Sequence, residues 1–202
     1  MARRRCRYRI VALGVSTGGV EALQILVGGL PGAFPVPILV AHHVSPDPAS
    51  ELAALIGRRC ALHVKEADEE ESLVPGTLYL APANYHLLVE TDGSLALSVD
   101  PPVNYARPSV DVLFESVASV FGPAAIGVIL TGAGEDGSRG LKAIKERGGT
   151  AIVQDPADAA MDGMPLSALD LVAADHIVRL AEVAALLCRL TETAPRNWEA
   201  TA

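Results

Sequence analysis

Residues 10–27 read IVALGVSTGGVEALQILV, and the fold class follows from this short stretch. The apolar run Ile10–Leu13 has the length of a buried strand, and three glycines lie within the next six residues. A segment of helical period then starts at about Gly19 and carries Leu23, Ile25, Leu26 and Val27. A strand, a glycine-rich turn and a helix in this order predict the repeating unit of a parallel sheet covered by helices.

The same alternation continues along the chain. We expect strands at 37–41, 62–66, 78–81, 125–131, 150–154 and 176–178, and helices at 47–60, 110–121, 137–147, 166–171 and 180–190. Between His86 and Val99, two extended runs instead flank Asp92-Gly93, which is a strong signal for an antiparallel hairpin. The sequence therefore predicts a doubly wound α/β domain, with a mostly parallel sheet, helices on both faces and an antiparallel β-hairpin insertion.

Composition agrees with a single α/β domain. Of the 202 residues, 50% are hydrophobic and only 4% are aromatic, so the core must consist mainly of aliphatic side chains. One domain usually contains about 100–200 residues. We expect a basic tail at 1–9, the folded domain at 10–190 and a C-terminal tail at 191–202.

Charge limits the classes of partner. The formal net charge is −8, which argues against nucleic acid as the main partner, because binding phosphates requires a basic surface. Residues 1–9 differ from this acidic composition, since they contain five arginines and no acid. We interpret them as a solvated tail, with weak attraction to an acidic partner or a lipid surface as the alternative.

The sequence predicts a cytoplasmic protein without membrane insertion. No apolar run has the length that a membrane-spanning helix requires, and the run after the arginines is too short for a signal peptide. The three cysteines, Cys6, Cys60 and Cys188, are far apart and form no C-x-x-C pair, which favours reduced thiols over a metal site.

Ligands and catalytic groups in such folds gather at the carboxyl ends of the strands. The turn Gly14–Gly19 contains the pattern G-x-S-x-G, in which a sharp strand-to-helix turn exposes a serine hydroxyl, here that of Ser16, as a nucleophile. A phosphate-binding turn and a purely structural turn are the alternatives, although neither dinucleotide nor P-loop patterns are present.

Two more strand ends carry reactive side chains. His42 and His43 end the next strand, where a neutral imidazole can take the proton of Ser16, and only one of them can face the serine. Asp136 lies in the glycine-rich loop after the strand at 125–131. It can orient the base by accepting its other ring N–H, or it can cap the following helix. Together these positions favour nucleophilic acyl transfer.

Other polar residues give weaker signals. His63, His86 and His176 show no pattern of partners, and we interpret them as structural or surface residues. The acidic run at 66–71 lacks the spacing of oxygen ligands, so a solvated loop is favoured over a cation site. Arg107 either closes its own loop or faces an anionic substrate surface.

Several longer motifs resemble the catalytic domain of the chemotaxis receptor protein-glutamate methylesterase family, the CheB type. They occur in order between about Ile10 and Leu190. The motifs are GVSTGG (14–19), VAHHV (40–44), LVPGTLYLAP (73–82), RPSVDVLFESV (107–117), GVILTGAGEDG (127–137) and GMP (163–165). Several long motifs in one order are specific, so the resemblance implies the fold, the activity and the site of that family.

The resemblance implies that Ser16 is the nucleophile, His43 the base and Asp136 the residue that orients the base. It selects His43 because the second histidine of VAHHV matches the catalytic histidine of the family. Backbone N–H groups near Thr17 and Ala133 are then expected to form the oxyanion hole. The family usually has methionine at the position of Ala133, but a change of side chain leaves the backbone donor in place.

The implied reaction is hydrolysis of glutamate methyl esters on the cytoplasmic helices of chemoreceptors, and some family members also deamidate glutamine there. No metal and no organic cofactor is implied. The implied partner is the methylated cytoplasmic domain of a chemoreceptor. The alternative is a receptor- or partner-binding module that keeps the fold without catalysis, which an intact Ser16, His43 and Asp136 disfavour.

The family often has a phosphorylatable receiver domain before the catalytic domain, whereas only nine residues precede the first expected strand here. From the sequence we expect one of three situations. The chain is a standalone esterase, it is regulated through a separate receiver or regulatory protein, or it is a fragment.

Overall fold

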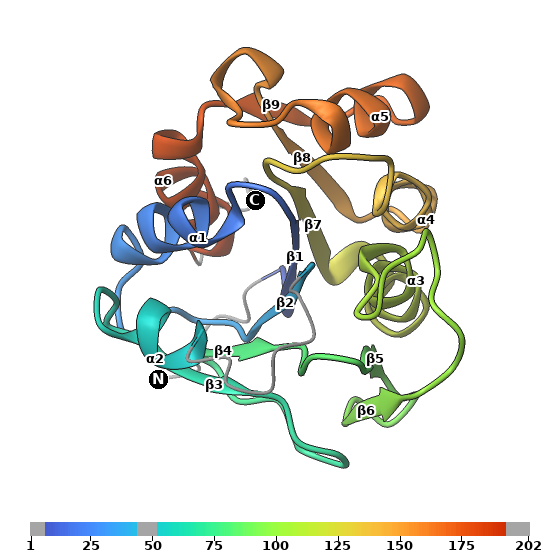
Figure 1. Ribbon diagram of the computed structural model, residues 1–202. Helices are drawn as coiled ribbons and strands as arrows, with labels where there is room; N and C mark the ends of the chain where they lie inside the picture. Colours follow the sequence, from blue (N-terminus) through green and yellow to red (C-terminus); the bar gives the residue numbers. More distant parts are fainter. Residues whose placement is uncertain (1–6, 44–51, 193–202) are drawn as a thin grey trace, which may run out of the picture.

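The computed structural model describes residues 7–43 and 52–192 (Figure 1). Within these residues the main sheet has seven parallel strands in the order β3-β4-β2-β1-β7-β8-β9, and β5 and β6 form a separate antiparallel pair. The strands are β1 (Ile10–Val15), β2 (Ile38–His42), β3 (His63–Glu66), β4 (Thr77–Leu80), β5 (His86–Val89), β6 (Leu95–Ser98), β7 (Ala125–Ile129), β8 (Thr150–Gln154) and β9 (His176–Val178). The helices are α1 (Gly19–Gly28), α2 (Leu52–Gly57), α3 (Val110–Phe121), α4 (Ser138–Glu146), α5 (Gly163–Leu171) and α6 (Leu180–Thr191), with short 3-10 helices η1 (Gly122–Ala124) and η2 (Pro156–Asp158). The predicted fold class is confirmed.

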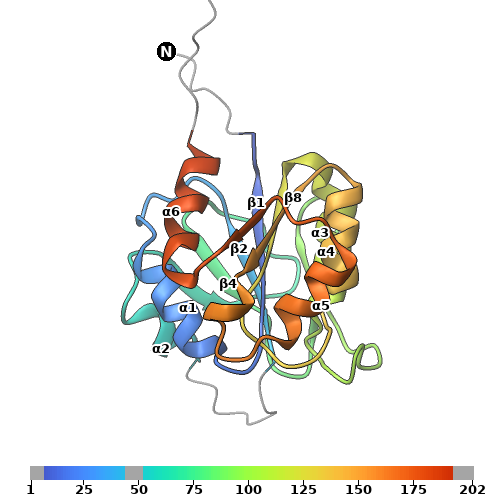
Figure 2. The ribbon, with the colours of Figure 1, turned by 90° about the horizontal axis from the view of Figure 1, so that it is seen from above.

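Helices cover both faces of the sheet. Helices α1, α2 and α6 lie on one face, and α3, α4 and α5 lie on the other (Figures 1 and 2). Strand β1 illustrates why both faces need cover. Val11 and Leu13 belong to the core cluster that includes α1 and α6. Ile10 and Ala12 belong to the cluster on the other face, which includes α3. Successive side chains of a strand point to opposite faces, so an uninterrupted apolar run requires cover on both.

The predicted hairpin is also confirmed. Strand β5 packs on α3, and Leu87 and Leu95 share a core cluster with Phe114. Gly93 has φ 91° at the turn, a conformation that favours glycine, and the Asp92 carboxylate accepts hydrogen bonds from the N–H and hydroxyl of Ser94 at 2.9 and 2.7 Å.

Several element boundaries differ from the prediction. The strand expected to reach residue 131 ends at Ile129. The helix expected at 47–60 is described from Leu52, because 47–51 lie outside the described residues, and it ends at Gly57 and not at residue 60. Helix α5 begins at Gly163 and not at residue 166. Pro165 lies in the first turn of this helix, where proline is tolerated because its missing N–H would have no partner anyway.

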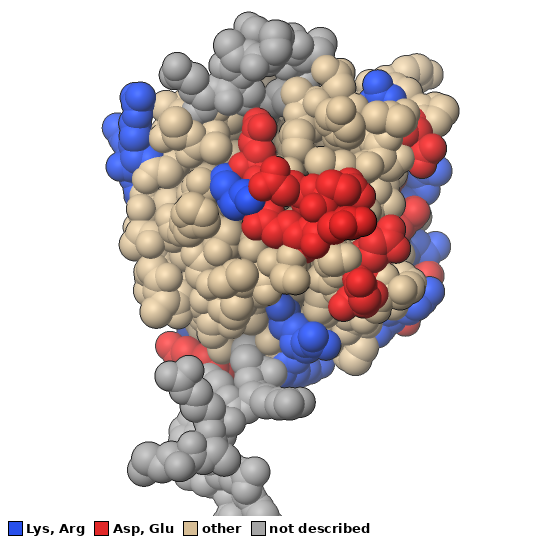
Figure 3. Space-filling model, turned by 90° about the horizontal axis from the view of Figure 1, so that it is seen from below, with Lys and Arg blue, Asp and Glu red and all other residues tan. Residues whose placement is uncertain are grey.

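An acidic patch covers the face near the β3 edge and the hairpin (Figure 3). The run at 66–71 contributes to it, and Lys65 donates hydrogen bonds to Asp68 at 2.6 Å and to Glu71 at 2.8 Å. The Glu69 carboxylate accepts the N–H of Leu97 at 2.7 Å. Residues 68–70 are exposed, as expected for a solvated loop. The run differs from that expectation because Glu66 ends β3, Ala67 is buried and the loop is joined to the hairpin.

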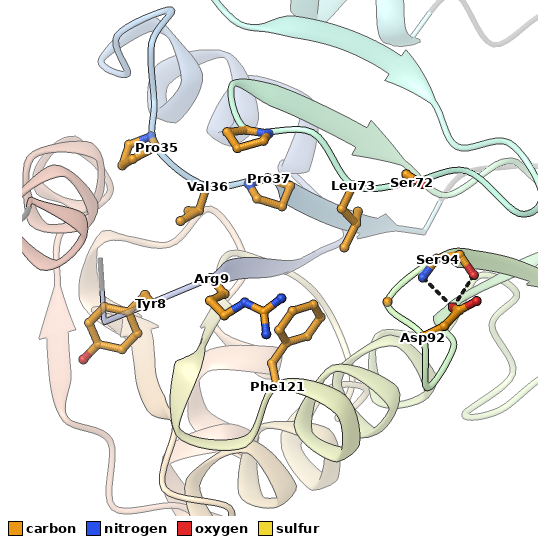
Figure 4. Close-up of a pocket in the computed structure, with 12 residues that line it drawn as sticks. Tyr8, Arg9, Pro35, Val36, Pro37, Ser72, Leu73, Asp92, Ser94 and Phe121 are labelled. Carbon is orange, nitrogen blue, oxygen red and sulfur yellow. Dashed lines mark hydrogen bonds between the residues drawn. The ribbon is translucent and has the colours of Figure 1, made fainter. Parts of the chain in front are cut away.

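A hollow of about 740 Å³ lies at the amino ends of β1, β2 and β4. Figure 4 shows the Arg9 guanidinium against the Phe121 ring on one side of it, with 5.2 Å between the guanidinium carbon and the ring centre. Beside it, Tyr8 is buried and its hydroxyl lies 2.8 Å from the Thr150 hydroxyl. None of the proposed triad residues lines this hollow, which is at the opposite edge of the sheet.

Within the described ranges, no helix has the length and apolar character needed to cross a membrane.

Candidate active site

The carboxyl ends of three adjacent strands bring Ser16, His43 and Asp136 together. Ser16 directly follows β1, His43 directly follows β2, and Asp136 lies in the loop between β7 and α4. In the sheet, β1 lies between β2 and β7, so the three side chains meet where the strand order reverses. This reversal is the usual binding position of a doubly wound fold.

The three side chains form one hydrogen-bonded chain. The Ser16 Oγ lies 3.2 Å from His43 Nδ1, and His43 Nε2 lies 2.7 Å from Asp136 Oδ2. For Nδ1 to accept the serine hydroxyl, the ring proton must be on Nε2, from where it is donated to the carboxylate. The side chain of His43 is 20% exposed and that of Asp136 only 3%, so the base reaches solvent while its partner is buried. Such a chain activates a hydroxyl for nucleophilic attack.

The Asp136 carboxylate lies at the amino end of α3. It accepts the backbone N–H groups of Val110 at 2.7 Å and Asp111 at 3.1 Å, and the Ser109 hydroxyl at 2.8 Å. A carboxylate there is stabilised by the first N–H groups and the dipole of the helix. The alternative prediction that Asp136 caps α4 is wrong, because Gly137 is the N-cap of that helix and no side chain caps it.

These contacts keep Asp136 ionised. Burial alone would raise the pKa of its carboxyl group, but hydrogen bonds from the His43 ring and the Val110 N–H lower it. The Asn104 amide and the Ser109 hydroxyl lower the pKa further, and the net result lies below the ordinary value. The base therefore faces a permanent negative charge near neutral pH.

Asn104 belongs to this network, although the sequence analysis did not identify it. Its Nδ2 donates to Asp136 and to Asp111, both at 2.8 Å, and its Oδ1 accepts a bond from Arg139 at 2.7 Å. Asn104 has φ 51°, which an asparagine tolerates better than most residues. No motif marks it, because it approaches from a loop 32 residues away from Asp136. Ser109, in contrast, lies within RPSVDVLFESV (107–117), which is one of the motifs identified in the sequence.

The serine is held in a tight turn. Gly18, the N-cap of α1, has φ 78°, so a side chain there would be strained. The Thr131 hydroxyl donates to the carbonyl of Thr17 at 2.9 Å, which ties the turn to the loop after β7.

That loop lies directly against the nucleophile. A Cβ atom on Gly132 would be 2.9 Å from the Ser16 Cβ and 2.1 Å from the Met164 sulfur. The N–H groups of Thr17 and Ala133, the predicted oxyanion donors, donate to no acceptor within the described part of the chain. Backbone N–H groups without another acceptor are the kind of donor that an oxyanion requires.

His42 faces away from the serine hydroxyl. Its ring packs against Gly19, and the side chain is 92% buried. Burial lowers the pKa of His42 to about 4, and the charge of His43 lowers it too, against a hydrogen bond with the Ser16 backbone that raises it. His42 is therefore neutral near pH 7, and the alternation along β2 gives only His43 access to the hydroxyl.

A hollow of about 330 Å³ opens beside the proposed base. It is lined by His43, Asn84, Pro102, Asn104, Tyr105, Ala106, Arg107 and Pro108. Arg107 closes this loop, because its Nη1 donates to the carbonyls of Val99 at 2.7 Å and Asp100 at 3.0 Å.

The other histidines lie apart from the triad. His86 is buried, accepts the N–H of Ser109 on Nδ1 and has Nε2 3.2 Å from the Pro101 carbonyl. His63 is exposed and His176 is partly buried. The described residues contain no group of three potential metal ligands.

Comparison with known proteins places this geometry in context. The profile of a family described as CheB methylesterase matches residues 11–187. A Leptospira interrogans protein, provisionally named protein-glutamate methylesterase/protein-glutamine glutaminase, is 42% identical over 92% of this chain and 96% of its own length. The protein-glutamate methylesterase FrzG of Myxococcus xanthus is 43% identical over 89% of this chain, which spans about half (54%) of that relative. The crystal structure of the Thermotoga maritima CheB methylesterase catalytic domain has a TM-score of 0.87 at 34% identity, covering 91% of this chain and 98% of that one.

Proposed function

The chain belongs to the CheB methylesterase family, and we propose from this premise that it hydrolyses glutamate methyl esters on a chemoreceptor. The observation that carries the proposal is the continuous hydrogen-bonded chain from Ser16 through His43 to Asp136. The substrate is a methylated helix of the cytoplasmic domain, and the products are glutamate and methanol. Deamidation of glutamine in the same helices is a second activity, supported by the names of several relatives.

The geometry supports an acyl-transfer mechanism with two half-reactions. The Ser16 Oγ attacks the ester carbonyl while its proton moves to His43 Nδ1, and Asp136 stabilises the resulting imidazolium. The bond between the carbonyl carbon and the methoxy oxygen then breaks, and His43 protonates the departing methoxide, so methanol leaves and an acyl-serine remains on the enzyme. A water molecule attacks this ester, gives its proton to His43, and releases glutamate as the serine is restored. No metal or organic cofactor takes part.

The developing oxyanion is bound by the N–H groups of Thr17 and Ala133. Both adjoin Ser16, one along the chain and one across the contact at Gly132, and both lack another acceptor among the described residues. Backbone donors in a fixed loop stabilise the charged transition state more than the neutral ester.

We assign catalysis to residues 10–190 together with the buried residues Tyr8 and Thr191 that adjoin this range. The proposed partner is the cytoplasmic domain of a methylated chemoreceptor. A cytoplasmic substrate implies a cytoplasmic enzyme.

The test is methanol release from methylated chemoreceptor membranes by the purified chain and its Ser16→Ala variant. We expect release by the wild type and a loss of at least about a thousandfold in the variant, since the nucleophile is removed. Circular dichroism should show that Ser16→Ala is folded. Ser94→Ala, at the hairpin tip, is the matched control and should keep its activity. Release that persists in Ser16→Ala would contradict the mechanism.

A further inference from the structure

The hollow beside His43 is lined by one positively charged side chain, that of Arg107. The guanidinium of Arg107 is fixed there by two backbone carbonyls, those of Val99 and Asp100, and both bonds use the same nitrogen, Nη1. The Nε atom is buried and has no hydrogen-bond partner. The Nη2 atom, in contrast, donates to no acceptor among the described residues and is not one of their buried unpartnered atoms, so it is the nitrogen that a ligand in the hollow can reach.

Arg107 also lacks an acidic partner. None of the ion pairs found among the described residues includes it, whereas Arg139 pairs with Asp111 and Lys65 with Asp68 and Glu71. The chain as a whole carries a net charge of −8. An uncompensated, pre-oriented guanidinium in an otherwise acidic protein is suited to bind a carboxylate, since guanidinium and carboxylate form paired, charge-assisted hydrogen bonds.

We propose that Arg107 binds a carboxylate of the substrate helix that lies one turn from the esterified glutamate. Arg107 and His43 line the same hollow of about 330 Å³, so a substrate whose ester reaches the base also reaches the guanidinium. On a helix, side chains three or four positions apart are neighbours, with about 5–6 Å between their Cβ atoms. This inference rests on the proposed function and adds its substrate preference: an ester flanked by an acid.

A binding role for Arg107 and a role that only closes the loop predict different kinetics for its variants. A purely structural arginine would affect all substrates alike when it is replaced. A residue that binds the flanking acid affects mainly the KM of substrates that carry this acid. The ratio of kcat/KM for two matched substrates therefore distinguishes the two roles.

The experiment uses two helical peptides with one glutamate methyl ester each, flanked at i−4 and i+4 by glutamate in one peptide and glutamine in the other. Methanol release is measured with the wild type, Arg107→Gln, Arg107→Lys and Arg147→Gln. Arg147, an exposed residue at the end of α4, is the control for the same change of net charge. We expect the wild type and Arg147→Gln to prefer the acidic peptide about tenfold through KM, as a charged hydrogen bond implies.

Arg107→Gln should lower this preference to within about twofold, and Arg107→Lys should retain only part of it, because lysine keeps the charge but lacks the planar donor set. An unchanged preference in either variant would overturn the proposal. Should Arg107→Gln fail to fold, the lysine variant decides alone. A wild type that hydrolyses both peptides equally also overturns the proposal, whereas one that hydrolyses neither peptide refutes the proposed function itself.

Discussion

At the scale of single residues, the buried charge of Asp136 is explained by its partners. Five hydrogen bonds from described residues reach its carboxylate: from His43, Asn104, Ser109 and the N–H groups of Val110 and Asp111. An unpaired buried carboxylate would be strongly destabilising, and such a set of donors offsets that cost. The proposed base therefore rests against a carboxylate whose position and charge are fixed before substrate binds.

His42 gives a prediction about acid stability. Its pKa is about 4 in the folded chain, below its ordinary 6.5, so between these values the unfolded chain binds a proton that the folded chain does not. The free energy of unfolding must then fall as pH falls from 6.5 towards 4, by about 2–3 kcal/mol at pH 4.5. His42→Gln should lose that part of the decrease, measured as urea denaturation at pH 7 and pH 4.5.

His63→Gln is the control for this measurement, because His63 is exposed. Its decrease between the two pH values should equal that of the wild type. If His42→Gln also shows the full decrease, His42 is not the group responsible.

Which site residues could be predicted depended on where each lies in the chain. Ser16, His43 and Asp136 lie at or just beyond the ends of readable apolar strands, so their meeting at one edge followed from parallel pairing. Asn104 comes from a proline-rich loop without periodicity, and its φ of 51° is set by tertiary contacts. The sequence indicates Arg107 as a candidate for contact with an anionic substrate. That its Nε has no hydrogen-bond partner is visible only in the three-dimensional structure.

At the scale of elements, the loop after β7 is fixed by close packing against α5. The Gly132 N–H donates to the Met161 carbonyl, and the Gly132 carbonyl accepts the N–H of Met164 at 2.8 Å. The proposed oxyanion donor, the N–H of Ala133, follows directly. The position of this donor therefore depends on how closely a glycine lets the loop approach the helix.

Gly132→Ala should consequently reduce activity more than stability. The new methyl group would meet the Met164 sulfur, which can move, and the Ser16 Cβ, which cannot move without shifting the nucleophile. We expect kcat/KM to fall at least about tenfold and the free energy of unfolding to fall by about 1–3 kcal/mol. Methanol release and urea denaturation measure the two.

Gly57→Ala is the matched control, since its new methyl group at the end of α2 would be 3.7 Å from the Val64 Cβ in β3, which is an ordinary contact. It should keep full activity. Wild-type kcat/KM in Gly132→Ala would show that the loop adapts without affecting the serine.

Element types were predictable from the sequence, but their ends were less so. The apolar run of β7 continues through Leu130, yet the strand ends at Ile129. The Thr131 N–H donates to the side chain of Gln154 in β8 at 2.8 Å and not to a backbone carbonyl of that strand. A side-chain acceptor supplied by another strand leaves no trace in the local pattern, so strand ends are set by contacts that sequence alone does not show.

At the scale of the whole molecule, one sheet separates two apolar clusters. The same strands contribute side chains to both clusters, so each cluster needs these strands in place. Tyr8 extends the first cluster at the amino end of β1, and its hydroxyl reaches Thr150 at the start of β8. The segment before β1 is thus joined to a strand two places away in the sheet.

Tyr8→Ala should therefore destabilise the entire fold. We expect a loss of about 3 kcal/mol for Tyr8→Ala and of about 1 kcal/mol for Tyr8→Phe, which removes only the hydroxyl. Both losses should appear in one cooperative transition when near- and far-ultraviolet circular dichroism are followed during urea denaturation. Tyr105→Ala is the control, because that ring is fully exposed. Separate transitions for the two signals would show that the faces unfold independently.

The position of Asp136 at the amino end of α3 affects how relatives of this chain should be read. A lineage that lost the reaction would still need an acid there, because the helix start depends on it. An aspartate at this position is therefore poor evidence that a relative is active. The Ser16 hydroxyl, in contrast, contacts only His43 among the described residues. Replacing this serine would destabilise the fold little. Relatives that are no longer selected for catalytic activity should therefore lose this serine before the other two residues.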